Sequence, residues 1–240
     1  MVAAGQFGWR AGLLVPTALA AVVAVLFYRT APETPPADPD ASLADQLEVG
    51  RLLALLSRPP IVLTAAVAAV GYFSFQSFAS FFPTFLVEFV GVTATQASLA
   101  FGAVFAITIV GAPALGQLSD RVGRDPVLAV SMAIGVLGFA TFLLVDGLPA
   151  LVGGTLLLGA GLSWAGVLNS RFMDSLAVHE RGTGFGLVRT IVLLVSSLGS
   201  VVTGTLADAA GWLPAFGLVA ALLGLTVVGL ALNRLAGLGG

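Results

Sequence analysis

Charged side chains in this sequence concentrate in one short stretch, GQLSDRVGRDP, which runs from residue 116 to 126 between two long apolar runs. Its residues of interest are Gly116, Asp120, Arg121, Gly123, Arg124 and Asp125. Arginine and carboxylate side chains so close together can form ion pairs, and at a membrane boundary they need such compensation. The two glycines permit close backbone approach and unusual dihedral angles. The stretch therefore predicts a tight turn stabilised by ion pairs.

Residues that could do other chemistry are scarce. The chain has no cysteine and a single histidine, His179, in a polar loop. A metal site therefore has little to build on, and hydrolysis inside a membrane would need a nucleophile beside a base or two embedded carboxylates. We expect no catalytic residue, no metal site and no cofactor, and no nucleic acid among the partners.

The elements that must position the charged turn are hydrophobic helices. Hydrophobic residues make up 58% of the chain, charged residues 9%, and the mean hydropathy is +1.05, which excludes an ordinary soluble protein. A helix of about 20 apolar residues crosses a bilayer. Seven such runs occur, at roughly 11–28, 60–82, 95–115, 127–145, 149–170, 186–207 and 213–233. Strand-like alternation is absent, so we predict an all-α, polytopic membrane protein with seven transmembrane helices. A signal sequence is the alternative for the first run.

The arginines fall almost entirely on one side of the predicted membrane. When the seven runs alternate in direction, nine of the ten arginines share a side with the carboxyl terminus. The opposite side keeps Arg10 and the acidic residues Glu88, Asp146 and Asp208. Because positive charge stays on the cytoplasmic side, we predict a multi-pass protein of the cytoplasmic membrane with its amino terminus outside and its carboxyl terminus inside.

The chain divides into three stretches. Residues 1–29 form a leading transmembrane helix, residues 30–58 a cytoplasmic linker, and residues 59–240 a six-helix unit. The first half of the linker is rich in proline and acidic residues and cannot pack a core. From Ser42 onward leucines recur at helical spacing, and Ser42 with Asp45 resembles a helix N-cap arrangement. We expect a short amphipathic helix on the membrane surface; a frayed extension of the second span is the alternative.

A second copy of the charged turn lies 88 residues further along the chain. Both copies read G-x-L-x-D-x-x-G, the first from Gly116 to Gly123 and the second from Gly204 to Gly211. Each copy joins the second and third spans of a three-span unit. Because three is odd, the two units enter the membrane in opposite orientations, which predicts a 3+3 inverted repeat.

The first copy, GQLSDRVGRDPVL, resembles the cytoplasmic signature loop of the major facilitator superfamily, G-x-L-[AS]-D-R-x-G-R-[RK]-x-x-[LV], with Asp125 in place of the second basic residue. The segment ERGTGFGL, residues 180–187, resembles the loop before the fifth or eleventh helix of that family. Gly8-Trp9-Arg10 and Gly211-Trp212 resemble the starts of its sixth and twelfth helices. The resemblance implies that the chain corresponds to helices six to twelve of a twelve-helix transporter, and that helices one to five have no counterpart in this sequence.

The resemblance also implies roles for residues of the turn. Asp120 would face the positive end of a helix in the opposite half and help to hold one of two alternating conformations. An arginine of the turn would pair with an acidic residue at the cytoplasmic end of the fifth predicted span, which in this chain is Asp174. We predict an ion pair between Arg124 and Asp174, with Arg121 as the competing partner.

Candidate substrate contacts lie in the second and fifth predicted spans. In the second span Gln76 is a single amide among six phenylalanines, Phe78 among them, and a polar side chain at that depth should face protein or water. By resemblance the fifth span also lines the cavity, with Trp164 and Asn169. The alternative is that the aromatic side chains pack and Gln76 joins two helices. Arg189 could bind an anion or extend to the membrane surface.

These observations predict secondary active transport of a small solute by alternating access, and no enzymatic activity. The partners would be the lipid bilayer, the solute, and either a chain that carries the missing amino-terminal half or a second copy of this chain. An incomplete or split permease is the expected form. The alternative is a non-transporting remnant or a membrane protein that regulates or stabilises a partner. A light-driven pump is excluded because retinal attachment needs a lysine and the sequence has none.

Overall fold

The computed structural model describes residues 9–32 and 49–235 of the chain. Within these ranges every regular element is helical, and seven spans are long and apolar enough to cross a membrane. The all-α, seven-span prediction is confirmed. The chain separates into two units, residues 1–46 and 47–240, and each is described by itself.

The smaller unit contains one described helix, α2 (Trp9–Thr30). Its apolar window runs from Leu13 to Thr30, close to the predicted run at 11–28. The hydroxyl groups of Thr17 and Thr30 donate to carbonyl oxygens one turn earlier in the helix. These bonds satisfy the two hydroxyl donors within the helix itself, as an apolar surrounding requires.

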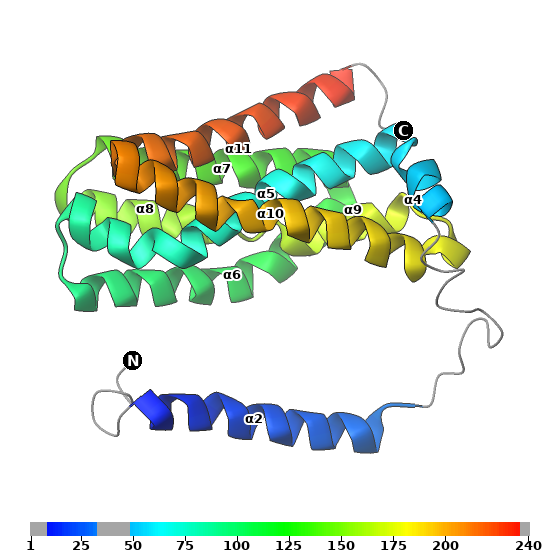
Figure 1. Ribbon diagram of the computed structural model, residues 1–240, viewed down its shortest axis with the longest axis horizontal. Helices are drawn as coiled ribbons and strands as arrows, with labels where there is room; N and C mark the ends of the chain where they lie inside the picture. Colours follow the sequence, from blue (N-terminus) through cyan, green and yellow to red (C-terminus); the bar gives the residue numbers. More distant parts are fainter. Residues whose placement is uncertain (1–8, 33–48, 236–240) are drawn as a thin grey trace. The chain divides into compact units, whose positions relative to one another are not determined.

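The larger unit is a bundle of long helices joined by short turns (Figure 1). Its elements are α4 (Val49–Leu56), α5 (Pro59–Phe85) with a π-helical turn η1 (Leu86–Val90), α6 (Ala94–Val122), α7 (Arg124–Leu144), α8 (Gly147–Gly161), α9 (Ala165–Asp174), η2 (Val178–Glu180), α10 (Thr183–Ala210) and α11 (Trp212–Leu235). Two of the spans extend beyond the apolar runs, to Val90 instead of residue 82 and to Val122 instead of 115. The first extension is mostly apolar with one charged residue, Glu88, and the second is polar. The helices continue because backbone hydrogen bonding does not depend on the polarity of the side chains.

The fifth predicted span is interrupted. The stretch 149–170 was expected to be one helix, but α8 and α9 are separated by a turn at residues 162–164. The hydroxyl of Ser131 in α7 donates to the carbonyl oxygen of Gly161, 3.1 Å away, so a carbonyl next to the interruption is satisfied from a neighbouring helix. Broken helices at membrane depth are tolerated where the surrounding protein supplies such partners.

The internal repeat is visible in the helix bounds. A shift of 88 residues carries the start of α5 to the start of α8, the end of α6 to the end of α10, and the start of α7 to the start of α11. The two turn glycines also share an unusual backbone conformation, with φ of 98° at Gly123 and 89° at Gly211. A residue with a side chain rarely adopts these angles. The matching bounds and turns confirm the repeat that the two G-x-L-x-D-x-x-G motifs predict.

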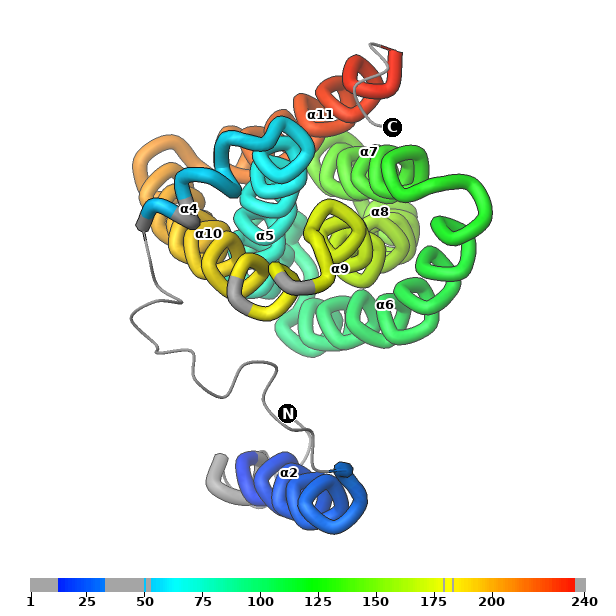
Figure 2. Tube along the Cα trace, turned by 90° about the vertical axis from the view of Figure 1, so that its right-hand side faces the viewer, coloured from blue at the N-terminus to red at the C-terminus, as the bar shows by residue number. Residues whose placement is uncertain are grey.

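Packing follows the same symmetry. Helix α5 packs along α10, its repeat-related counterpart α8 packs along α6, and α7 packs against α11. Figure 2 looks along the bundle and shows α10 and α6 on opposite sides of the pair formed by α5 and α9, with α7 and α11 adjacent to each other. Hydroxyl groups join α5 to α10: Ser196 Oγ donates to the carbonyl oxygen of Ala69, and Thr203 Oγ1 to Ser77 Oγ. Such bonds are a usual means of helix association in membranes.

The short helix α4 is a separate element. It ends at Leu56, and α5 begins with Pro59 and Pro60 at its first two positions, where proline is well tolerated. Leu55 is buried, and α4 packs against α10 and the start of α5. The short helix is therefore not a frayed extension of the second span. The predicted N-cap at Ser42 and Asp45 lies outside the described residues.

Candidate functional site

Arg124 lies at the centre of the charged turn. Its Nε donates to Oδ2 of Asp174 at the end of α9, 3.1 Å away. Its Nη1 donates to Oδ1 of Asp120, 2.5 Å away, and to Oγ of Ser119. One guanidinium therefore connects the end of α6, the start of α7 and the end of α9. The predicted contact between Arg124 and Asp174 is present.

The other residues of the turn have different surroundings. Arg121 is exposed and forms no ion pair within the described part of the chain. The side chain of Asp120 is 64% exposed. The expectation of unusual dihedral angles is met at Gly123 and was wrong for Gly116, because α6 continues to Val122 and Gly116 is an ordinary helical residue with open space beside it. A role of these residues in a conformational switch stays a prediction.

A buried ion pair beside the turn was not expected from the sequence. Arg171 of α9 donates from Nε to Oδ1 of Asp125 in α7, 2.5 Å away, and Arg171 is 8% exposed. Its Nη1 donates to the hydroxyl of Thr64 in α5, and the amide of Asn233 in α11 donates to Asp125 Oδ2. Buried charges are tolerated when they are paired and hydrogen-bonded in this way. The pair joins α5, α7, α9 and α11 at one end of the bundle.

Two signals in the sequence point to this pair. Asp125 replaces a basic residue of the signature that the turn resembles, and Arg171 lies at the edge of an apolar run. Oppositely charged residues that both fall near membrane spans are expected to pair. The sequence alone does not show that α7 and α9 are neighbours.

The opposite end of the bundle has a neutral version of the Arg124 contact. Trp212, which the 88-residue shift relates to Arg124, begins α11, and its Nε1 donates to Oε2 of Glu88 in η1, 3.0 Å away. The two contacts are related by the internal repeat, since each joins the start of a third helix to the end of the first span in the other triplet. Both ends of the bundle are thus tied by a hydrogen bond to a carboxylate.

A surface ion pair joins the start of α5 to the turn η2. The Arg58 guanidinium donates to both carboxylate oxygens of Glu180, each at 2.8 Å. This hydrogen bonding, with the negative charge of Glu180, raises the pKa of Arg58 above its ordinary value. Glu180 also accepts the backbone N–H of Ala177, so the arginine fixes the turn that leads into α10.

One of the candidate substrate contacts, Asn169, lies against Arg189 of α10. The Arg189 Nη1 donates to Oδ1 of Asn169 in α9, 3.0 Å away. The guanidinium carbon lies 5.4 Å from the ring centroids of both Tyr72 in α5 and Phe185 in α10, a cation–π distance. We call Tyr72, Asn169, Phe185 and Arg189 the Arg189 cluster.

The remaining candidates differ in burial. Gln76 lies one turn after Tyr72 on the same face of α5, is half-buried, and has no hydrogen-bond partner among the described residues. Phe78 is fully buried between Phe75, Phe82 and rings of α6. Trp164 is also buried, with its ring edge-to-face on Tyr72 at a centroid distance of 5.1 Å. The structure therefore brings Asn169 and Trp164 to Tyr72 and Arg189, and it places Phe78 in the packed interior.

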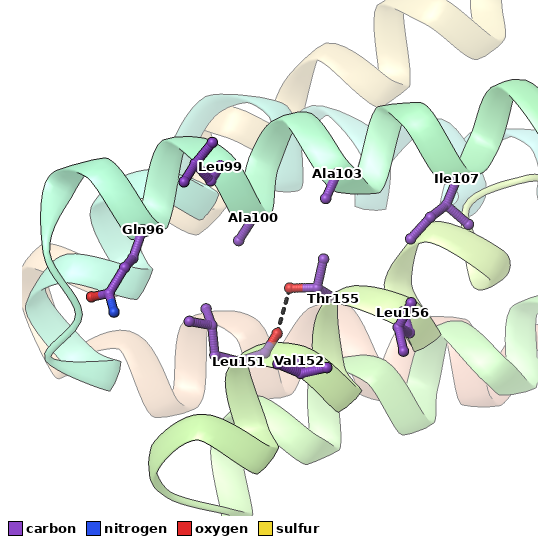
Figure 3. A pocket seen from close by; sticks show the side chains of 9 residues that line it. All are labelled: Gln96, Leu99, Ala100, Ala103, Ile107, Leu151, Val152, Thr155 and Leu156. Atoms are coloured by element: carbon purple, nitrogen blue, oxygen red, sulfur yellow. Dashed lines mark hydrogen bonds between the residues drawn. The ribbon is translucent and has the colours of Figure 1, made fainter.

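A groove of about 330 Å³ lies between α6 and α8 (Figure 3). It is lined almost entirely by apolar side chains of the two helices, with Gln96 at one end and Thr155 as the other polar residue. Thr155 donates its hydroxyl to the carbonyl oxygen of Leu151, so it offers no free donor. Within the described residues no group of three His, Cys, Asp or Glu side chains could hold a metal ion.

Comparisons with known proteins agree with this architecture. Residues 65–236 match the family described as Major Facilitator Superfamily. No curated protein matches the sequence. Among solved structures, an in meso crystal structure of the POT family transporter PepTSo is similar, with a TM-score of 0.61 and 20% sequence identity, over 74% of this chain and 37% of that chain. The chain thus corresponds to little more than a third of that transporter, and at this identity the likeness concerns the fold.

The family match takes in most of α5 and all of α6 to α11. It includes the signature turn at Gly123 and its repeat at Gly211, the two positions with matching backbone geometry. Family, fold and signature therefore agree over most of the sequence, and the chain belongs to the major facilitator superfamily.

Proposed function

We propose that the larger unit is one of two lobes of a secondary transporter that moves a small solute across the cytoplasmic membrane by alternating access. The observation that carries this proposal is the set of polar side chains at membrane depth on α5, α9 and α10: Gln76, Asn169 and Arg189. Such residues face protein or a water-filled cavity and not lipid. Their chemistry suits the binding of a solute, and we propose a carrier and not an enzyme.

The burial of the helices supports a second lobe. In the larger unit, 11% of the apolar window of α6 and 22% of that of α10 is buried, against 33% to 56% for the other spans. These two helices lie on either side of α5 and α9 (Figure 2). A second lobe packed against α6 and α10 would cover the exposed sides of both helices and would enclose a cavity in front of α5 and α9. It could come from a further part of the same polypeptide, from a separate chain, or from a second copy.

The contacts at the two ends support movement of the lobe as one body. Arg124 with Asp174 at one end, and Trp212 with Glu88 at the other, join the two triplets of helices. The exposed carboxylate of Asp120 and the exposed Arg121 stay available for the second lobe. We propose that Gly123 and these charges form the surface at which the lobes separate and meet.

Reactivity of engineered cysteines tests the cavity, because the native chain has no cysteine. We expect Gln76→Cys to react with a water-soluble maleimide in membranes. Phe78→Cys, two residues further on and 0% exposed, is the matched control and should stay unreactive. If neither cysteine reacts, residue 76 is not accessible to water, and this result would contradict the proposed aqueous cavity.

Transport itself is tested in proteoliposomes. The chain is purified with any membrane protein that copurifies, reconstituted, and assayed for uptake of a panel of labelled small solutes against empty vesicles. We expect uptake that Gln76→Leu reduces. A stable protein that takes up no solute, alone or with a copurifying partner, would favour the non-transporting alternative.

A further inference from the structure

Arg189 is a positive charge without a negative partner. Its apolar span runs from Gly184 to Ala210, and the four ion pairs of the described residues use Arg58, Arg124 and Arg171. The contacts of Arg189 are an amide oxygen and two aromatic rings. An unpaired charge in a membrane span is costly and usually marks a functional site.

One contact of the Arg189 guanidinium lies well inside the span formed by α5. Tyr72, which it contacts, lies 13 residues after Pro59, the first residue of α5, or about 20 Å along the helix. An arginine that reaches back to the interface would extend toward the first residues of α10 and α5. Arg189 contacts Phe185, the third residue of α10, and also Tyr72 and Asn169, so its guanidinium lies between the start of α10 and residues in the middle of α5 and α9.

Donors around Arg189 outnumber acceptors. A guanidinium has five N–H donors, and within the described residues one hydrogen bond is made, to Asn169. Trp164, whose ring meets Tyr72 edge-to-face, has a buried indole N–H with no partner. Arg189 is half-buried, and the Trp164 N–H is a fully buried donor without an acceptor, which is rare and calls for an explanation. An incoming oxyanion would supply both the missing negative charge and the missing acceptors.

We propose that the Arg189 cluster binds the carboxylate or related oxyanion of the transported solute, with Tyr72 and Phe185 against an apolar part of the same molecule. The substrate class is then a small organic anion with an apolar body. This inference rests on the proposed transport function and names the substrate class of its cavity. Arg189 supplies the charge, and Asn169 holds the guanidinium in place.

Ligand-dependent thermal stability of the purified chain in a neutral detergent tests the proposal, because a ligand that binds the folded state raises Tm. The probes are benzoate and phenyl phosphate, with benzamide as the neutral counterpart. We expect the two anions, and not benzamide, to raise Tm. Arg189→Gln should weaken the apparent affinity for the anions about 10- to 100-fold, and Arg189→Lys should weaken it less. Arg181→Gln removes the same charge from an exposed position and is the control.

Asn169→Asp provides a second variant that does not depend on the folding of Arg189→Gln. It places a carboxylate on the guanidinium, so we expect a higher Tm without ligand and loss of the response to benzoate. Equal responses to benzamide and to the anions, or an anion response that survives both Arg189→Gln and Asn169→Asp, would overturn the proposal.

An anionic lipid headgroup carries the same oxyanion chemistry as a soluble anion. To distinguish the two ligands, we would measure Tm in nanodiscs of phosphatidylcholine with and without phosphatidylglycerol. Stabilisation by phosphatidylglycerol that needs Arg189, without any response to the soluble anions, would overturn the proposal.

The anion site and the transport function can fail separately. Anion binding that needs Arg189, in a protein that takes up no solute, would refute the transport function and keep the anion site. Uptake that is unchanged in Arg189→Gln would refute the site and keep the carrier.

Discussion

At the scale of single residues, the charged side chains of this chain differ more in burial than in type. Arg121 and Arg124 belong to the same turn, yet only Arg124 is held by two carboxylates. Arg171, which lies outside the charged turn, is the buried member of the set. Burial decides which of these charges contribute to stability, because exposed pairs are worth little and unpaired buried charges are costly.

Removal of one partner of the buried pair tests this argument. Arg171→Met leaves Asp125 without its partner in a largely buried position, so we expect a loss of about 3–5 kcal/mol in the free energy of unfolding. The double variant Arg171→Met with Asp125→Leu removes both charges and should recover most of that loss. Thermal and denaturant unfolding in detergent measure the three free energies. Arg181→Gln, an exposed change, should stay within about 0.5 kcal/mol of the native protein.

If the double variant is no more stable than Arg171→Met alone, the two side chains are not energetically coupled.

The ion pair between Arg171 and Asp125 could be anticipated from sequence only in part. An acid in place of a basic residue at Asp125 is a visible irregularity, but the partner depends on how α7 and α9 pack.

At the scale of helices, the repeat makes the two ends of the bundle comparable. Arg124 and Trp212 occupy equivalent positions at the starts of α7 and α11, and each donates to a carboxylate of the other triplet. The end with tryptophan lacks the positive charge, which agrees with the prediction from the arginines that this end faces outward. The two halves of the repeat therefore share the position of this contact but not the charge of its donor.

Substitutions at Trp212 separate the hydrogen bond from the packing of the ring. Trp212→Phe removes the N–H that reaches Glu88 and keeps a ring near Phe85 and Phe216, so we expect a loss of about 0.5–1.5 kcal/mol in stability. Trp212→Ala also removes the half-buried ring and should therefore cost more than Trp212→Phe. Unfolding in detergent gives both values. Glu88→Gln keeps an oxygen acceptor and should cost less than Trp212→Phe; the reverse order would show that the hydrogen bond is not what holds this end.

The interruption between α8 and α9 shows where prediction of elements stops. The run at 149–170 is mostly apolar and has no charged residue, and hydropathy cannot distinguish one continuous helix from two helices in line. The turn at residues 162–164 depends on neighbours, including the Ser131 hydroxyl that reaches Gly161. A tertiary contact therefore stabilises a break that the local sequence does not announce.

At the scale of the whole molecule, the orientation predicted from the arginines is open to direct test. The chain has no cysteine, so single cysteines report from known places. Ala209→Cys, at the end of α10, should react with a membrane-impermeant maleimide in intact cells. Ala177→Cys, in the loop before α10, should react only after permeabilisation. Both positions are exposed, so accessibility to the reagent is matched, and the opposite pattern would invert the topology.

The sequence by itself determined the membrane class, the number of spans, the inverted repeat and the family, because each follows from composition, periodicity or a motif within one contiguous segment. It also led to the contact of Arg124 with Asp174, through resemblance to the signature. The tertiary structure alone decided the buried pair of Arg171 with Asp125, the break near Trp164 and the grouping of Tyr72, Asn169 and Arg189. These features depend on side chains from different helices, and the distance between helices is set by packing, which no local pattern in the chain encodes.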